Sequence, residues 1–517
     1  MSAPHDAIVV GSGAAGGWAA KTLAEHGIRV LVLEAGPLLA GDQRVDRAAH
    51  SGARQPVQSR CSAYEPGNSH LFVDDLDHPY QTPQDTPFHW FRGRQTGGRL
   101  PLWAGVCLRL SDREFSGETG RHLGADHRSW PIRHAELAPY YARVESFMRV
   151  SGGGEHSPGV PAPAAARARE QTRGERRLAA AVAARWPGRQ LLGGRVADAP
   201  ADAVLSRALR TGRVTLRTDA VVSHLETDSR GGRATGVVFV DRRTGATHRE
   251  RAATVVLAAS AIESVRILLN SRSRHHRDGL GGNHGQLGRY FFDHVAGASV
   301  SGVVPGLDVR PVPRPDPGFV PVCHIPDFRD GERGFPGGYG ITVFAPEVLP
   351  LSRASAAWAL EHDAAPFRMW ASGEVLPGRD NRVTLADESD AFGIPQARVR
   401  LAYGSAEQAM AAHQAAEMRA MADAAGFTVH EVGDRPATPG TSVHEMGGAA
   451  MGTTARDSVV DRAGRLWEAP NVVVADAACF TTGGWQNPTL TIMALAARAG
   501  DRLARAAGAG EPECETT

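Results

Sequence analysis

Two regions near opposite ends of the 517-residue chain carry residue types suited to binding a phosphate group and to moving a proton. The first is a glycine-rich turn with the sequence Gly-Ser-Gly-Ala-Ala-Gly at residues 11–16. The second contains His444 and Asn487. A histidine side chain exchanges a proton near neutral pH, and an asparagine amide holds an oxygen atom without adding charge. The fold must therefore bring two distant parts of the chain together.

The segments around the glycine-rich turn match a dinucleotide-binding unit. A short, mostly β-branched run at residues 7–10 predicts a buried strand, and residues 17–24 predict a helix. Residues 28–33 predict a second apolar strand, which is followed by Glu34 and Ala35. The interval from the turn to Glu34 is close to the spacing at which an acidic residue binds ribose hydroxyls. We therefore expect a nucleotide at this turn.

Each position of the turn has a physical role in such a unit. Gly11 permits the tight turn, Gly13 lets a pyrophosphate approach the backbone, and Gly16 lets the helix pack on the strand. The N-terminus of the helix that follows the turn faces the phosphates. A glycine-rich turn without a ligand is the structural alternative. The motif alone also leaves NAD and FAD as alternatives.

Three segments near the C-terminus form a more specific pattern. They read Thr-Ser-Val-His-Glu-Met-Gly-Gly at 441–448, Asn-Val-Val-Val-Ala-Asp-Ala at 471–477 and Trp-Gln-Asn-Pro-Thr-Leu-Thr at 485–491, and a helix is expected at about 492–506. In these segments the chain resembles the glucose–methanol–choline (GMC) flavin oxidoreductases. The resemblance covers most of the chain and includes residues 94–98, 103–105, 130–141, 211–226, 255–270, 287–294 and 381–385.

The resemblance implies a mechanism that suits these residues. In this family an alcohol loses its hydroxyl proton to a base while its carbon passes a hydride to flavin N5. By the resemblance His444 is the base and Asn487 its partner, although some relatives carry a second histidine in place of Asn487. Two structural alternatives stay open. His444 could be a packing residue beside a helix, and Asn487 could cap the helix that begins near Pro488.

The resemblance also implies which residues contact FAD. Asp476 is expected beside the ribityl chain or the pyrophosphate, with a purely structural polar contact as the alternative. Val222 is expected near the adenine. The full set of expected cofactor-binding residues is Gly11, Gly13, Ala14, Ala15, Gly16, Glu34, Ala35, Gly97, Gly98, Val222, Ala258, Asp476, Ala477, Asn487, Pro488 and Thr489.

Leu102 bears on how the flavin is held. Pyranose-oxidase-like members of the family place at this position a histidine that bonds covalently to the flavin, whereas leucine has no nucleophile. We therefore expect non-covalent FAD, with a nearby histidine such as His89 as the alternative attachment point. The five cysteines form no CxxC pair, so the sequence has no zinc or iron–sulfur spacing and no metal site is expected.

The overall composition excludes several classes of protein. Lysine and arginine total 57 against 56 aspartates and glutamates, and this balance gives no global attraction to nucleic acid or to an anionic membrane. No apolar run approaches the ~18 residues of a membrane span, and the N-terminus lacks the pattern of a signal peptide. We therefore expect a cytoplasmic protein that has neither nucleic acid nor a membrane as its partner.

The charges are unevenly distributed along the chain. Residues 301–440 hold 18 acidic residues against 12 arginines and no lysine, which gives a net charge of −6. An acidic substrate domain favours a cationic or polyhydroxylated substrate, because complementary potentials steer the encounter. The alternative is that these acids only keep the surface hydrated.

The motifs predict an α/β fold of two main domains. Residues 1–40, 88–115, 204–294 and 441–517 are expected to form a discontinuous, Rossmann-like FAD-binding domain. Residues 295–440 are expected to form a sheet-based α+β substrate-binding domain. The Pro-rich segment 41–87 is interpreted as a lid or interface arm, and residues 116–203 as a helical connecting region.

These observations predict an FAD-dependent enzyme that oxidises an alcohol group of a sugar or sugar-like small molecule to a carbonyl. An amino sugar, as in aminoglycoside antibiotic biosynthesis, is a special case. The alternatives are an NAD-dependent dehydrogenase, an oxidase of a non-sugar alcohol such as a sterol, and a non-catalytic flavin-binding module. The electron acceptor, dioxygen or another carrier, and the oligomeric state stay open.

Overall fold

The structure is a computed structural model that describes most of the chain. The described residues are 5–39, 58, 70–118, 129–153, 155, 157–164, 170–308, 310–312, 322–329, 333–350, 361 and 364–508. Most of the 41–87 segment, which the sequence predicts to be a lid or arm, lies outside the described residues.

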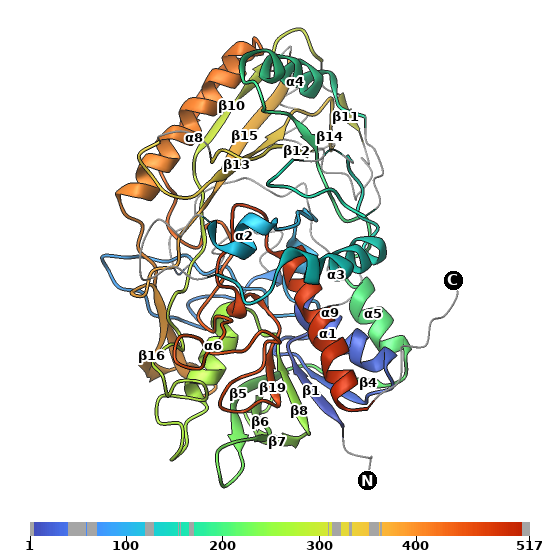
Figure 1. The fold of residues 1–517 in the computed structure, drawn as a ribbon, viewed down its shortest axis with the longest axis vertical. Coiled ribbons are helices and arrows are strands. Elements are labelled where there is room, and N and C mark those ends of the chain that lie inside the picture. Colours follow the sequence, from blue (N-terminus) through green and yellow to red (C-terminus); the bar gives the residue numbers. More distant parts are fainter. Residues whose placement is uncertain are drawn as a thin grey trace.

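A five-stranded parallel sheet forms the base of the molecule (Figure 1). Its strand order is β19-β8-β1-β2-β4, and all neighbouring strands run parallel. The apolar runs of β1 and β2 are buried along their full length, because both faces of a parallel sheet are covered. The strands are β1 (Ala7–Val10), β2 (Val30–Leu33), β4 (Val214–Arg217), β8 (Thr254–Leu257) and β19 (Val472–Val474).

Helices rich in small residues cover this sheet. Helix α1 (Ala14–Glu25) packs against β1, β2 and β8, and helices α5 (Ala203–Arg210) and α9 (Thr489–Ala506) pack along α1. The close approach of α9 to α1 requires a glycine, because a Cβ on Gly500 would lie 2.8 Å from the Cβ of Thr22. Helix α3 (His134–Phe147) packs on α9 from outside.

A small antiparallel sheet and one further helix complete this half of the molecule. The sheet has the order β5-β6-β7, and β6 packs against β8 of the parallel sheet. Its strands are β5 (Ala220–Thr227), β6 (Ala234–Asp241) and β7 (Thr247–Arg251). Helix α6 (Ala261–Asn270) packs on β5 and on the hairpin of β16 (Arg382–Ser389) and β17 (Pro395–Arg400).

A seven-stranded, antiparallel sheet forms the other half (upper part of Figure 1). Six strands follow the order β18-β10-β15-β13-β12-β3, and β9 pairs with β15. The strands are β3 (Leu192–Gly193), β9 (His294–Val295), β10 (Ser299–Val304), β12 (Val322–Ile325), β13 (Tyr339–Phe344), β15 (Ala365–Glu374) and β18 (Thr428–Gly433). Helix α8 (Ser405–Ala424) packs on this sheet, and α4 (Arg173–Arg185) packs on α8.

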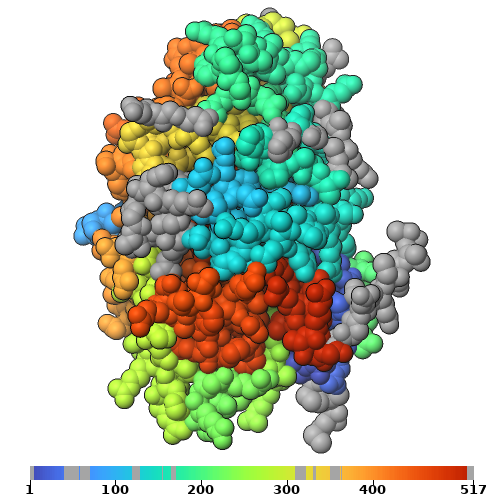
Figure 2. All heavy atoms as spheres, in the orientation of Figure 1, coloured from blue at the N-terminus to red at the C-terminus, as the bar shows by residue number. Residues whose placement is uncertain are grey.

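Short elements join the two halves. Helix α2 (Asp112–Ser116) lies between them in Figure 1, and two 3-10 turns are η3 (Leu100–Leu102) and η5 (Ala477–Cys479). Strands β11 (Arg310–Val312) and β14 (Val348–Pro350) form a small parallel pair. In Figure 2 the light-blue to teal part of the chain, at about residues 100–160 on the colour bar, covers the space between the halves on the face shown.

The predicted α/β fold, with a parallel sheet and a separate sheet-based unit, is confirmed. Two element boundaries were predicted wrongly. The helix predicted from residue 17 begins at Ala14, because Gly13 is its N-cap. The helix expected at about 492–506 begins at Thr489. In the predicted helical connecting region, Thr172 and Glu175 form a capping box that starts α4 at Arg173. Among the described residues, none of the helices has the length and apolar character needed to cross a bilayer.

Candidate active site

The carboxyl edge of the parallel sheet brings together residues that are far apart in sequence. Gly11 follows β1, Glu34 follows β2, Ala258 follows β8, and Asp476 closes the segment after β19. These strands are adjacent and parallel, so their C-terminal ends meet at one edge. Ligands of open α/β sheets bind outside this edge. Four of the predicted cofactor residues therefore lie at one edge of the sheet.

The N-terminus of α1 is built to receive an anion. Gly13 is the N-cap, no side chain caps the helix, and the first turn has no acidic residue. The Ser12 side chain does not cap α1, because its hydroxyl donates to Glu34 (2.6 Å) and accepts from the Gly97 N–H (3.0 Å). A Cβ on Gly98 would lie 3.1 Å from the Cα of Gly13, so these glycines bring two backbone segments together. The first-turn N–H groups of α1 thus suit a pyrophosphate.

Glu34 fixes the shape of the glycine-rich turn. Its carboxylate accepts hydrogen bonds from the backbone N–H of Ser12 (3.0 Å) and of Gly36 (2.9 Å), in addition to the Ser12 hydroxyl. Burial raises the pKa of this carboxyl group. Glu34 holds the turn between β1 and α1, a role that the sequence did not reveal. Its contact with ribose stays a prediction.

Asp476 makes the structural contacts that the sequence left as an alternative. Its carboxylate accepts from the Ser264 hydroxyl (2.5 Å) on α6 and from the Ala478 N–H (3.0 Å). Burial raises the pKa of Asp476 to about 6, although the Ser264 hydrogen bond opposes this shift. The neighbouring Ala477 carbonyl accepts from the Gly447 N–H (2.9 Å). This hydrogen bond places Ala477, which follows Asp476, next to Gly447 of the loop that carries His444.

His444 and Asn487 meet in space. Asn487 Nδ2 lies 3.1 Å from His444 Nε2, and both residues are only partly buried. The interpretation of Asn487 as a helix cap is wrong, because α9 has Pro488 at its N-cap position and no side-chain cap. His444 also differs from a packing histidine, since both of its ring nitrogens face polar groups. The pair has the composition expected for holding and deprotonating a hydroxyl group.

The loop before His444 is held in a strained conformation. Val443 has a φ angle of 58°, which is rare for a β-branched residue. Arg99 donates to the Val443 carbonyl (3.2 Å) and forms an ion pair with Glu445 (2.7 Å). On the other side, the buried Asp293 accepts from the Gly440 N–H (2.8 Å) and from the Ser442 hydroxyl. These contacts fix the backbone of His444 from two directions.

A second histidine, which the sequence did not single out, contacts the ring of His444. His294 lies at the start of β9 with no exposed surface, and its Nδ1 is 2.9 Å from His444 Nδ1. Burial lowers the pKa of His294 to about 4, while the carbonyls of Gly483 and Gly484 oppose this shift. Burial, His294 and Arg99 hold the pKa of His444 well below its ordinary value. His444 is therefore neutral at neutral pH, as a base must be.

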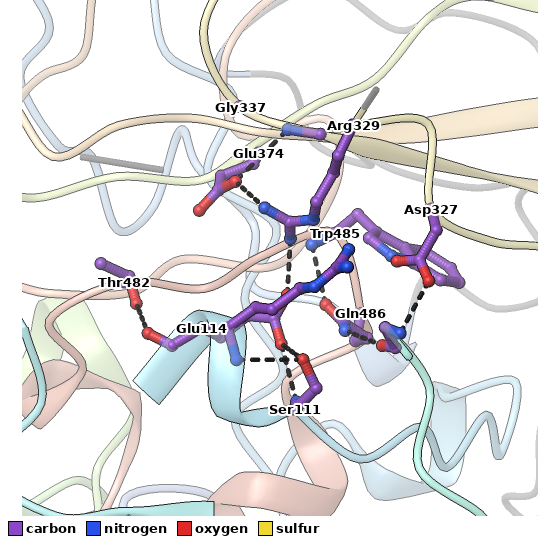
Figure 3. A network of polar contacts seen from close by, with 12 residues as sticks. Ser111, Glu114, Asp327, Arg329, Gly337, Glu374, Thr482, Trp485 and Gln486 are labelled. Atoms are coloured by element: carbon purple, nitrogen blue, oxygen red, sulfur yellow. Dashed lines mark hydrogen bonds and ion pairs between the residues drawn. The ribbon is translucent and has the colours of Figure 1, made fainter. Parts of the chain in front are cut away.

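A buried ion-pair network positions the segment that leads to Asn487 (Figure 3). Arg329 lies between Glu114 of α2 (2.5 Å) and Glu374 of β15 (2.9 Å). The Glu114 carbonyl accepts from the Thr482 hydroxyl (3.0 Å), and Gln486 donates to the Gly159 carbonyl (2.7 Å). These bonds tie residues 482–486 to α2 and to Gly159, and Asn487 follows directly.

Three other predicted cofactor residues, Val222, Ala35 and Thr489, and also Leu102 lie at separate places. Val222 is buried on β5, next to the edge that carries Glu34. Leu102 ends η3 with a half-buried side chain. Ala35 is half-buried, and Thr489 is the first residue of α9. Sequence reasoning missed Arg99, Asp293 and His294, and the adjacent polar pair Asp293-His294 after an aromatic run was the available signal.

Comparisons with known proteins agree with this arrangement. Family models described as GMC oxidoreductase match residues 7–296 and residues 377–496. A 2-methyl-1,2-propanediol dehydrogenase of Mycolicibacterium austroafricanum is 29% identical over 97% of this chain and 95% of its own. A 6'''-hydroxyparomomycin C oxidase of Streptomyces lividus is 30% identical over 96% of this chain and 91% of its own.

A solved structure shows the same fold at low sequence identity. The crystal structure of pyridoxine 4-oxidase from Mesorbium loti superposes with a TM-score of 0.63 at 18% identity. The superposition covers 96% of this chain and 99% of the other. Both halves of the molecule and the junction between them are therefore part of the shared architecture.

Proposed function

Because this chain belongs to the GMC oxidoreductase family, we propose that it oxidises an alcohol group of a sugar or sugar-like small molecule to a carbonyl. The family consists of flavin-dependent alcohol oxidases and dehydrogenases. We therefore propose FAD as the cofactor, in place of the NAD-dependent dehydrogenase that the sequence left as an alternative. The single observation that carries the proposal is the pairing of His444 with Asn487, because it joins a neutral base to a polar group that can hold a hydroxyl.

The residues at the sheet edge fit FAD without a covalent bond. The uncapped N-terminus of α1 and the facing Gly13 and Gly98 would hold the pyrophosphate, and Asp476 would lie beside the ribityl chain. When bound, FAD supplies the acceptor for the hydride of the substrate carbon. Leu102 offers no nucleophile for attachment at the position where some members carry a histidine.

Non-covalent FAD has a direct test. Acid precipitation of the purified yellow protein is expected to release all of its flavin as intact FAD into the supernatant, because no side chain bonds to the ring. The measurement is the flavin absorbance of the supernatant and of the washed pellet. Flavin that stays with the pellet would show that another residue, such as His89, attaches it.

His444 and Asn487 have separate tasks in the proposed reaction. His444 Nε2 takes the hydroxyl proton of the alcohol, and the O–H bond breaks as the N–H bond forms. The lowered pKa of His444 keeps this nitrogen unprotonated at neutral pH. Asn487 holds the substrate oxygen, since its amide can both donate and accept a hydrogen bond.

Two observations favour a sugar-like substrate. The Streptomyces lividus relative is named as an oxidase of a paromomycin derivative, and this chain aligns with it over nearly its full length. The proposed substrate domain, residues 295–440, includes the acidic stretch 301–440 with its net charge of −6. Such a domain favours cationic groups, as on an amino sugar, because opposite charges attract the substrate toward it.

An alcohol panel tests the proposed substrate class. Glycosides, amino sugars, aliphatic diols and sterols are assayed with an artificial electron acceptor, and hydrogen peroxide is measured in parallel. We expect the highest kcat/KM for a sugar-like alcohol, with an aminated sugar preferred over its neutral counterpart. A clear preference for sterols or simple aliphatic alcohols would contradict the substrate class. Peroxide formation identifies dioxygen as the acceptor.

A further inference from the structure

The ring of His444 is hydrogen-bonded at both nitrogens, and the partners determine where its proton lies. Asn487 Nδ2 is a donor without a lone pair, so His444 Nε2, 3.1 Å away, must accept. The single proton of the neutral ring is therefore on Nδ1. His444 Nδ1 lies 2.9 Å from His294 Nδ1, so it donates there and His294 Nδ1 accepts.

The surroundings of His294 lead independently to the same proton arrangement. With Nδ1 as the acceptor, the proton of the neutral His294 ring is on Nε2. This nitrogen is buried and has no direct hydrogen bond among the described residues. However, the carbonyls of Gly483 and Gly484 interact with the ring and favour an N–H on it, because carbonyl oxygens only accept. The contacts at Asn487 and those at Gly483 and Gly484 therefore indicate the same positions for the two ring protons.

We propose that His294 is a positioning residue that fixes the tautomer and the orientation of His444, so that His444 Nε2 is the proton-accepting atom. The proposal rests on the proposed function, in which His444 is the base. Without an acceptor at His294 Nδ1, the His444 ring could carry its proton on Nε2, which cannot take a proton from an alcohol. His294 itself cannot touch substrate, because none of its surface is exposed.

The adjacent residues Asp293 and His294 both contact the loop that carries His444. Asp293 accepts from the Gly440 N–H and the Ser442 hydroxyl, and so fixes the backbone two and four residues before His444. His294 fixes the ring. The Tyr403 hydroxyl donates to the His294 carbonyl (2.9 Å), which holds β9 itself in place. Backbone and side chain of the base are therefore positioned by adjacent residues.

The test replaces His294 by leucine and by asparagine in the FAD-loaded enzyme. His294→Leu removes the acceptor and is expected to lower kcat by about 10²-fold, the usual cost of a misplaced reacting group, with little change in KM or flavin content. His294→Asn can accept through Oδ1 near the position of Nδ1, and is expected to recover most of the lost kcat. His276→Leu, a matched change of another buried histidine, whose ring contacts Glu468 and the Gly231 carbonyl, is expected to retain wild-type kcat.

A double-mutant cycle separates positioning from general damage. If His294 acts through His444, then adding His294→Leu to His444→Ala lowers kcat no further than His444→Ala alone. Additive losses, or equal losses in the leucine and asparagine variants, would overturn the proposal, as would wild-type kcat in His294→Leu. Wild-type kcat in His444→Ala would instead overturn the base assignment in the proposed function, so the two failures are distinguishable.

Discussion

Replacing His444 by alanine is expected to lower kcat by about 10²–10⁴-fold while the protein keeps its FAD. The reason is that a positioned base contributes this much to a proton transfer, and no other described group is as well placed. Asn487 lies 3.1 Å from the ring, but its amide cannot take a proton at neutral pH. Flavin binding should persist, because the proposed pyrophosphate site at Gly13 is a different part of the chain.

The measurement is the steady-state rate with the best alcohol of the panel, with the flavin content of each preparation as the control. His276→Leu provides a second control, since it removes a buried histidine that contacts Glu468 and the Gly231 carbonyl. A His444→Ala variant that turns over at the wild-type rate would show that the base lies elsewhere. A variant that loses its flavin would show that His444 supports the cofactor site.

Replacing Gly13 by aspartate is expected to weaken FAD binding strongly without unfolding the protein. Gly13 is the N-cap of α1 with φ −69° and ψ −159°, a conformation open to any residue, and a Cβ there would meet no atom closer than 3.7 Å. Aspartate is also a preferred N-cap residue and stabilises a helix N-terminus. The same carboxylate would repel the pyrophosphate, which we expect to weaken FAD binding by about 10²-fold or more.

Gly13→Asn is the matched control, because asparagine has the shape of aspartate and caps a helix equally well without a charge. FAD content and melting temperature of all three proteins provide the measurements. We expect the aspartate variant to melt at or above the temperature of flavin-free wild type and to bind less FAD than the asparagine variant. Full FAD occupancy in Gly13→Asp would place the pyrophosphate away from α1.

The part of the site that depends on local sequence was predictable. The glycine-rich turn, the strands on either side of it and Glu34 follow one another within a single βαβ unit, so spacing alone indicates their arrangement. His444 and Asn487 were identified through the family resemblance. Their pairing depends on loops that approach each other across the fold, and no local pattern encodes that approach.

The residues that support the site were not predictable in this way. His294 starts β9 in the antiparallel sheet, and the antiparallel bridge between Phe292 and Met446 brings it opposite His444. Arg329 joins Glu114 and Glu374, which lie on separate elements of the sequence. Capping of α9 by Asn487 was an open alternative because asparagine is a good N-cap residue, but in the structure its amide lies against His444. Tertiary contacts override such local preferences.

Anaerobic flavin reduction tests the central claim most directly, because it isolates the proposed chemical step from the unknown electron acceptor. Mixing the FAD-loaded enzyme with a sugar-like alcohol in a stopped-flow instrument should bleach the oxidised-flavin absorbance and form one carbonyl product per flavin. His444→Ala should bleach about 10²–10⁴-fold more slowly at the same FAD content. Equal bleaching rates in the two proteins, or a flavin that stays oxidised with every alcohol of the panel, would contradict the account.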